Sequence, residues 1–198
     1  MPDSPDDPNR IVSAADSRFV CYPVDQVTKY WIKGQRFTVG QLIHDDELAQ
    51  AYTHISIFRL APQDYHRFHA PVDATIGKKK DIVGNLYTVN PMAVHENLDV
   101  FTENKRAVLE LDVGLAHPIL FIAVGALLVG SIAWTVNEGD KVKKGQDMGY
   151  FAYGGSTCIV LFPEELGVEF DEDLVKWSTQ SMETILKVGM GIATAHPK

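Results

Sequence analysis

The stretch from Val113 to Val136, VGLAHPILFIAVGALLVGSIAWTV, contains no formally charged residue, and this constrains the fold more than any other feature. Its length alone would allow a membrane span, which needs about 20 apolar residues. However, His117-Pro118 interrupts its start, and Gly125 and Gly130 divide the remainder into short pieces rich in β-branched residues. Such pieces are typical of strands that are buried on both faces. The sequence therefore predicts two buried strands around a tight connection rather than a transmembrane helix.

Composition limits the function classes. The chain has 198 residues, of which 45% are hydrophobic, enough to build the core of a single domain. Its formal net charge of −8 argues against a nucleic-acid binder and gives no general attraction to anionic membranes. Two cysteines, Cys21 and Cys158, form neither a disulfide framework nor a zinc-ligand pattern. Residues 1–10 are a polar leader without the apolar core of a signal peptide, so we expect a cytoplasmic or peripheral membrane protein.

Most of the remaining chain has the pattern of strands. Residues 53–60 alternate so that Ile55, Ile57 and Leu60 should face inward. Residues 28–39 predict a hairpin, and further strands are expected at 86–89 and 107–113.

Two helices are expected. A short one should cover residues 41–52. The stronger one, near the C-terminus, should be capped by Asp171, with Leu174, Trp177 and Ile185 at helical spacing and a returning strand after it. The predicted fold class is α+β and β-rich: a compact β-sandwich or barrel-like core with a C-terminal helix.

Two local patterns could support chemistry. Gly154-Gly155-Ser156-Thr157 lies inside an apolar, β-prone run, where paired glycines mark either a bulge or a site at which the backbone itself reacts. His66 and His69, three residues apart, are either hydrogen-bonded structural groups, part of a metal site or catalytic bases. A metal site would need three or four ligands, and only Asp64 and Asp73 are at workable spacing. The chain has 26 acidic residues, so spacing cannot select the carboxylate that a serine–histidine pair would need.

The chain resembles the phosphatidylserine decarboxylase family, whose members make their own pyruvoyl cofactor. Seven segments carry the resemblance, occur in the family's order and cover most of residues 10–190. They are VSAADSR (12–18), KGQRFTVGQL (33–42), FRLAPQDYHRFHAPVDATI (58–76), YTVNPMAV (87–94), TENKR (102–106), VGALLVGSI (124–132) and GGSTCIVLF (154–162).

The resemblance implies a self-cleaving enzyme. Ser156 attacks the carbonyl of Gly155, and elimination then yields a β chain of residues 1–155 and an α chain of residues 156–198 that begins with a pyruvoyl group. By the same correspondence, His69 is the base that activates Ser156 and Asp16 is the carboxylate that orients it. His66 supplies a proton to the substrate after carbon dioxide leaves. The resemblance implies no metal, and it makes residues 11–198 one catalytic domain.

The implied reaction is that of a carboxy-lyase, the conversion of phosphatidylserine into phosphatidylethanolamine. Two alternatives stay open: a decarboxylase of a free amino acid such as tryptophan, and an unprocessed homologue without catalysis. Residues 136–151 also resemble the turn pattern of biotinyl- and lipoyl-type β-sandwiches, in architecture only. The expected partners are the substrate, a peripheral membrane surface and a second copy of the chain in a homodimer. The two cleavage fragments should also remain bound to each other, and no nucleic acid is expected.

The chain departs from the family's pattern at three points. Ala74 replaces the usual glycine after Pro-Val-Asp, and Ala70 replaces a frequent serine before that proline; both are small, so the turn should be kept. The region that in relatives precedes the Ala15-Asp16 motif and helps membrane attachment is missing, which leaves membrane docking open.

Overall fold

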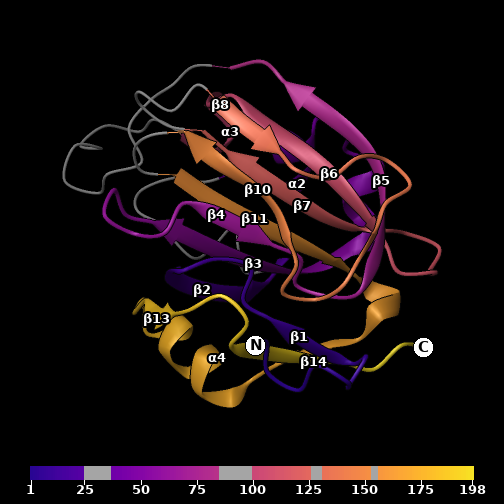
Figure 1. The fold of residues 1–198 in the computed structure, drawn as a ribbon, viewed down its shortest axis with the longest axis vertical. Helices are drawn as coiled ribbons and strands as arrows, with labels where there is room; N and C mark the ends of the chain where they lie inside the picture. Colours follow the sequence, from indigo (N-terminus) through magenta and orange to yellow (C-terminus); the bar gives the residue numbers. More distant parts are fainter. Residues whose placement is uncertain (25–36, 85–99, 126–130, 153–155) are drawn as a thin grey trace.

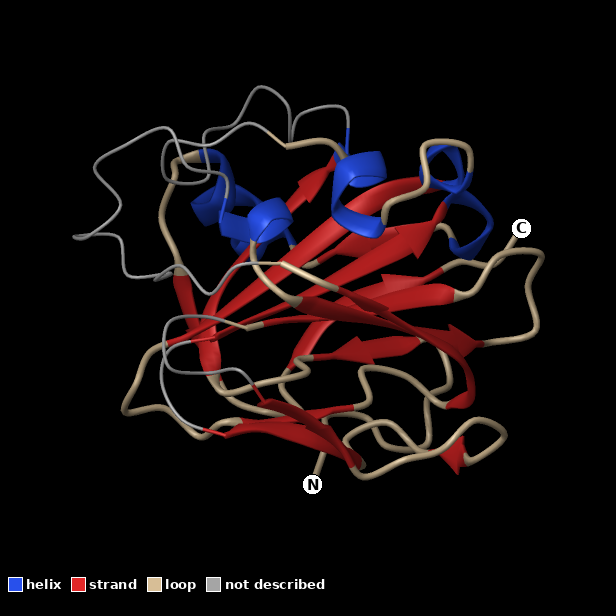
Figure 2. Cartoon of the chain, turned by 90° about the horizontal axis from the view of Figure 1, so that it is seen from above, coloured by secondary structure: helices blue, strands red, loops and turns tan. Residues whose placement is uncertain are grey.

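Antiparallel strands dominate the structure. The computed structural model describes residues 1–24, 37–84, 100–125, 131–152 and 156–198. Within these residues the strands form one large sheet and two small ones (Figure 1). In Figure 2 the strands fill the interior and the helices lie along the outside. The predicted class, a β-rich α+β fold with a C-terminal helix, is confirmed.

The large sheet has eight strands in the order β13-β2-β3-β11-β7-β6-β5-β9. Their bounds are β13 Thr184–Leu186, β2 Ser17–Pro23, β3 Tyr52–Leu60, β11 Ser156–Pro163, β7 Ile119–Val124, β6 Arg106–Asp112, β5 Ala74–Ile82 and β9 Lys141–Val142. The small sheets follow the orders β4-β10-β8 and β1-β14-β12. Their strands are β4 Arg67–His69, β10 Asp147–Ala152, β8 Ser131–Trp134, β1 Arg10–Val12, β14 Gly191–Ala195 and β12 Val168–Phe170.

The central strands are apolar on both faces because a hydrophobic core lies on each side of the large sheet. In β11, Val160 and Phe162 belong to one core, while Ile159 and Leu161 belong to the other. The alternation follows from the period of two along a strand. The first core also contains Phe68 of β4, whose ring centroid lies 5.2 Å from that of Phe121 in β7, so the β4 sheet packs against the large one.

The uncharged segment folds into two strands, as predicted, but the expected burial holds for β7 and not for β8. β7 is buried along its whole length, whereas residues 132–134 of β8 are half-buried; the connection, residues 126–130, lies outside the described residues. Among the described residues, no helix is both long and apolar enough to cross a membrane. Ile55, Ile57 and Leu60 are buried as predicted. The expected hairpin and the strand at 86–89 fall mainly or wholly outside the described residues.

The helices are short. The expected helix at 41–52 is replaced by two pieces, α2 (Val39–Ile43) and the 3₁₀ turn η1 (Leu48–Ala51). A further helix, α3, covers Val100–Glu103, and a 3₁₀ turn, η2, covers Glu164–Leu166.

The C-terminal helix, α4, covers Glu172–Thr179. The prediction that Ile185 belongs to this helix is wrong: Ile185 lies on the edge strand β13 and is 71% exposed. Asp171 does precede the helix, but its side chain makes no capping hydrogen bond. Arg10 binds that carboxylate instead, with Nη1–Oδ1 and Nη2–Oδ2 distances of 2.7 and 2.6 Å.

Candidate active site

Ser156 is the first residue of β11, a strand in which every residue is buried. Its register partner is Leu60, the last residue of β3. The Ser156 hydroxyl oxygen is buried and has no hydrogen-bond partner among the described residues. Buried polar atoms without partners are rare because each costs free energy, so this one needs a reason.

The segment before Ser156 comes from the β4-β10-β8 sheet. β10 ends at Ala152, and residues 153–155 lie outside the described residues, so the predicted cleavage bond is described on its Ser156 side only. The backbone N–H of Phe151 on β10 donates to the carbonyl of His66, with an N–O distance of 2.9 Å. The chain therefore approaches Ser156 from a strand that is bonded to the loop carrying His66.

His66 follows β3 and directly precedes β4. Both nitrogens of its ring are buried and have no hydrogen-bond partner among the described residues. The chain runs from Leu60, opposite Ser156, through only a few residues to His66. Two connections, one before Ser156 and one before His66, thus join the large sheet to the small one at the same end.

His69 is the last residue of β4, and its ring is fixed at one nitrogen. Nδ1 lies 2.9 Å from the carbonyl oxygen of Gly145. A carbonyl can only accept, so Nδ1 carries the proton and Nε2 keeps a lone pair. Nε2 is buried without a partner among the described residues. This is the tautomer that a general base requires.

Asp16 makes different contacts from those expected of a residue that orients His69. Its carboxylate accepts from the Lys187 ammonium at 2.8 Å and from the Val188 backbone N–H at 2.9 Å. The loop that carries Asp16 nevertheless reaches His69, because the His69 backbone N–H donates to the carbonyl of Ala14 at 2.8 Å. The role of Asp16 stays a prediction.

Unpaired buried atoms are concentrated on the predicted residues. Within the described part of the chain, seven buried side-chain nitrogen or oxygen atoms have no partner, and four of them belong to His66, His69 and Ser156. The next residue, Thr157, contributes a fifth atom, its hydroxyl. A buried serine hydroxyl and buried imidazole nitrogens that have no other hydrogen-bond partner are suited to nucleophilic attack and proton transfer.

Sequence reasoning missed three neighbours of the histidines. Gly145 supplies the carbonyl that fixes His69, and a backbone carbonyl has no signature in the sequence. The Tyr65 ring lies beside the His69 ring, with centroids 5.9 Å apart. Arg67 is ion-paired with Asp147, and its guanidinium carbon lies 5.1 Å from the centre of the Tyr150 ring.

Across the described ranges, no three His, Cys, Asp or Glu side chains lie close enough together to hold a metal ion.

Comparison with known proteins identifies the same family throughout. The family model described as phosphatidylserine decarboxylase matches residues 2–194. Phosphatidylserine decarboxylase proenzyme 3 of Schizosaccharomyces pombe is 47% identical over 188 residues, which is 93% of this chain and 19% of the relative. The corresponding proenzyme of Fusobacterium nucleatum is 40% identical over 184 residues, 91% of this chain and 61% of the relative. The chain thus spans less than two thirds of the length of these relatives.

Proposed function

The chain belongs to the phosphatidylserine decarboxylase family, and from this premise we propose that it is a self-processing carboxy-lyase that acts on phosphatidylserine. Residues 11–198 form its single catalytic domain after the polar leader of residues 1–10. The observation that carries the proposal is the set of buried, unpaired polar atoms on Ser156, His66 and His69. The relatives of Schizosaccharomyces pombe and Fusobacterium nucleatum are both named as proenzymes, which supports processing into two chains.

The first reaction is cleavage of the chain. Nε2 of His69 takes the hydroxyl proton of Ser156 while Oγ attacks the carbonyl carbon of Gly155. The peptide C–N bond then breaks, the Ser156 nitrogen receives the proton, and Gly155 is joined to Oγ as an ester. Loss of the Ser156 α-proton expels the Gly155 carboxylate. The dehydroalanine left at residue 156 hydrolyses to ammonia and a pyruvoyl group.

Asp16 supports this step as a positioning residue. Its ion pair with Lys187 and its bond from the Val188 N–H anchor the loop of residues 14–16. The Ala14 carbonyl of that loop holds the backbone of His69. We therefore propose that Asp16 positions His69 indirectly, by fixing the loop that holds the His69 backbone.

The residues around Ser156 fit a pyruvoyl group, because the side chain that would be converted is buried and hydrogen-bonds to no other described group. When present, this group supplies an electron-withdrawing carbonyl for an amine substrate. His66 then gives the substrate's α-carbon a proton after carbon dioxide leaves, and its buried ring nitrogens are uncommitted for that purpose. The β and α chains remain partners of each other, and the site meets its lipid substrate at a peripheral membrane surface, as a monomer or a homodimer.

Carbon dioxide release from two substrates tests the proposal. Purified chain should release it from vesicles that contain phosphatidylserine, and the Ser156→Ala variant should not. Release from free tryptophan but not from the vesicles would show the amino-acid decarboxylase that the sequence left open. Release from neither, by a fully cleaved preparation, would contradict the proposal.

A further inference from the structure

The carbonyl that fixes the His69 ring belongs to a tight turn, Lys143–Gln146. The Gln146 N–H donates to the Lys143 carbonyl at 2.9 Å, and Gly145 has a φ of 78°, the positive value that the third residue of a type II turn requires. The turn also pairs with Ala70: the Gly145 N–H donates to the Ala70 carbonyl at 2.7 Å. The position of the Gly145 carbonyl therefore depends on what holds this turn.

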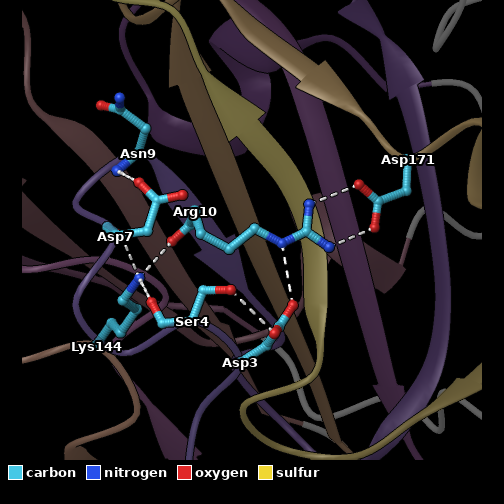
Figure 3. Close-up of polar contacts among 7 residues, drawn as sticks. All are labelled: Asp3, Ser4, Asp7, Asn9, Arg10, Lys144 and Asp171. Carbon is cyan, nitrogen blue, oxygen red and sulfur yellow. Dashed lines mark hydrogen bonds and ion pairs between the residues drawn. The ribbon is translucent and has the colours of Figure 1, made fainter.

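Lys144, at the second position of the turn, is held by the N-terminal segment. Its side chain is 6% exposed. Its ammonium donates to the backbone carbonyls of Ser4 at 2.7 Å and Arg10 at 3.1 Å, and also to that of Asp7 (Figure 3). An ammonium has three protons, so these carbonyls satisfy all of them. The Lys144 backbone N–H is bound as well, by Asp73 at 2.8 Å.

The N-terminal segment is itself fixed to other parts of the chain. The Asp3 N–H donates to the Gly189 carbonyl at 2.6 Å. Arg10 connects Asp3 with Asp171, as Figure 3 shows. The segment also covers the turn directly, because a Cβ atom at Gly145 would come within 3.2 Å of the Pro2 ring. Lys144 thus joins an anchored segment to the residue before Gly145.

We propose that Lys144 is a positioning residue for self-cleavage, which holds the Gly145 carbonyl on Nδ1 of His69 and so keeps the lone pair of the ring on Nε2. The inference rests on the proposed role of His69 as the base. Without the three carbonyl contacts, the buried end of Lys144 loses its anchor and the turn is free to shift. Nδ1 then loses its acceptor, and the alternative tautomer, protonated on Nε2, cannot take the Ser156 proton.

The chain offers a matched control in the neighbouring lysine. Lys143 belongs to the same turn, but its side chain is 83% exposed and its ammonium binds only Asp73, at 2.7 Å, among the described residues. Lys144→Met and Lys143→Met each remove one ammonium and keep a chain of similar length. The inference predicts an effect for the first substitution alone.

The first readout is the tautomer of His69, which does not depend on activity. Ring nitrogen chemical shifts should be measured in the Ser156→Ala background, where the chain stays uncleaved, at alkaline pH where imidazole is neutral. The parent should carry the proton on Nδ1. Lys144→Met should shift the population toward Nε2–H, and Lys143→Met should leave it unchanged. A purely structural role of Lys144 would lower stability without changing the tautomer.

The second readout is the rate of self-cleavage after cell-free synthesis, with Ser156 intact. Lys144→Met should slow cleavage by about ten- to a hundredfold, less than loss of the base itself. Lys143→Met should cleave at the parental rate. If Lys144→Met does not fold, removal of residues 2–7, which takes away two of the three carbonyls, should give the same tautomer shift and the same slowing.

Two results would overturn the inference, and they are distinguishable. If His69→Ala blocks cleavage while Lys144→Met and the deletion keep the parental tautomer and rate, Lys144 does not position the base and the proposed function stands. If His69→Ala cleaves at the parental rate, the base assignment fails and the inference fails with it.

Discussion

At the scale of single residues, three side chains keep buried polar atoms that nothing else in the described structure satisfies. A buried unpaired group costs about 1–3 kcal/mol, and His66, His69 and Ser156 carry four such atoms between them. Such a free-energy cost is expected at a reactive site, where the polar atoms must stay available for the reaction. The two histidines differ in one respect: His69 is fixed by Gly145 at Nδ1, whereas neither ring nitrogen of His66 has a partner among the described residues.

That difference predicts separable defects. His69→Ala should accumulate the uncleaved chain, because no base is left to activate Ser156. His66→Ala should cleave normally and then lose about a hundredfold to ten-thousandfold of its decarboxylase rate, the usual contribution of a general acid. A denaturing gel and a carbon dioxide assay on the same preparations measure both effects. Uncleaved His66→Ala together with cleaved, inactive His69→Ala would reverse the two roles.

The cysteines make a second prediction at this scale. Burial raises the pKa of the Cys21 thiol to about 12 and that of Cys158 well above its ordinary value. At about pH 8 both are therefore thiols, and the thiolate is the form that reacts. Iodoacetamide should label neither in the native protein and both in urea, as mass spectrometry would show. Rapid labelling of native Cys158, two residues from Ser156, would mean that the start of β11 is open to solvent.

At the scale of elements, β11, the strand that begins at Ser156, is paired on both sides within the large sheet. β11 lies between β3 and β7 and is paired with both along most of its length. Residues 156–198 also supply β14, which pairs with β1 from the N-terminal end of the chain. After cleavage, the two fragments should therefore stay together during gel filtration in native buffer and separate only in denaturant. Separation in native buffer would contradict this arrangement.

The Arg10–Asp171 pair adds a specific connection between the two proposed fragments. Its two hydrogen bonds are short, and the side chains are only 18% and 30% exposed. Arg10→Met should lower the free energy of unfolding by about 1–3 kcal/mol, measured in urea on the Ser156→Ala background. The control is Lys198→Met, which removes an ion pair with Glu164 that is 66% exposed on both sides and should cost about 0.5 kcal/mol or less. If both variants lose the same free energy of unfolding, the partly buried pair stabilises the fold no more than the exposed one does.

The observed strands and helices also show which elements could be predicted from sequence patterns. The uncharged segment predicted β7 because a strand that is buried on both faces must be apolar throughout. It also predicted β8, but residues 132–134 of that strand are half-buried rather than buried. The C-terminal helix was predicted too long, because Ile185 matches helical spacing by coincidence and is held on β13 by pairing with β2.

In the candidate site, residue types and the family resemblance identified Ser156 and both histidines. The contacts of Asp16 with Lys187 and of His69 with Gly145 arise from tertiary packing, which leaves no local pattern.

At the scale of the whole molecule, the net charge limits any electrostatic attraction between the chain and an anionic lipid surface. With a formal net charge of −8, the 198-residue chain is repelled by anionic headgroups beyond contact distance. Its co-sedimentation with phosphatidylserine vesicles should be weak and should not improve when salt is lowered. Binding that strengthens steeply at low salt would reveal a local basic surface that outweighs the net charge.

If the chain cuts itself between Gly155 and Ser156, the mass of the purified protein under denaturing conditions will show it. We predict two species, residues 1–155 and residues 156–198, the second beginning with a pyruvoyl group and therefore blocked to Edman degradation. Ser156→Ala should give one species. A single 22.0 kDa species from the parent chain would contradict self-cleavage, and a fragment that begins with an ordinary serine would contradict formation of the pyruvoyl group.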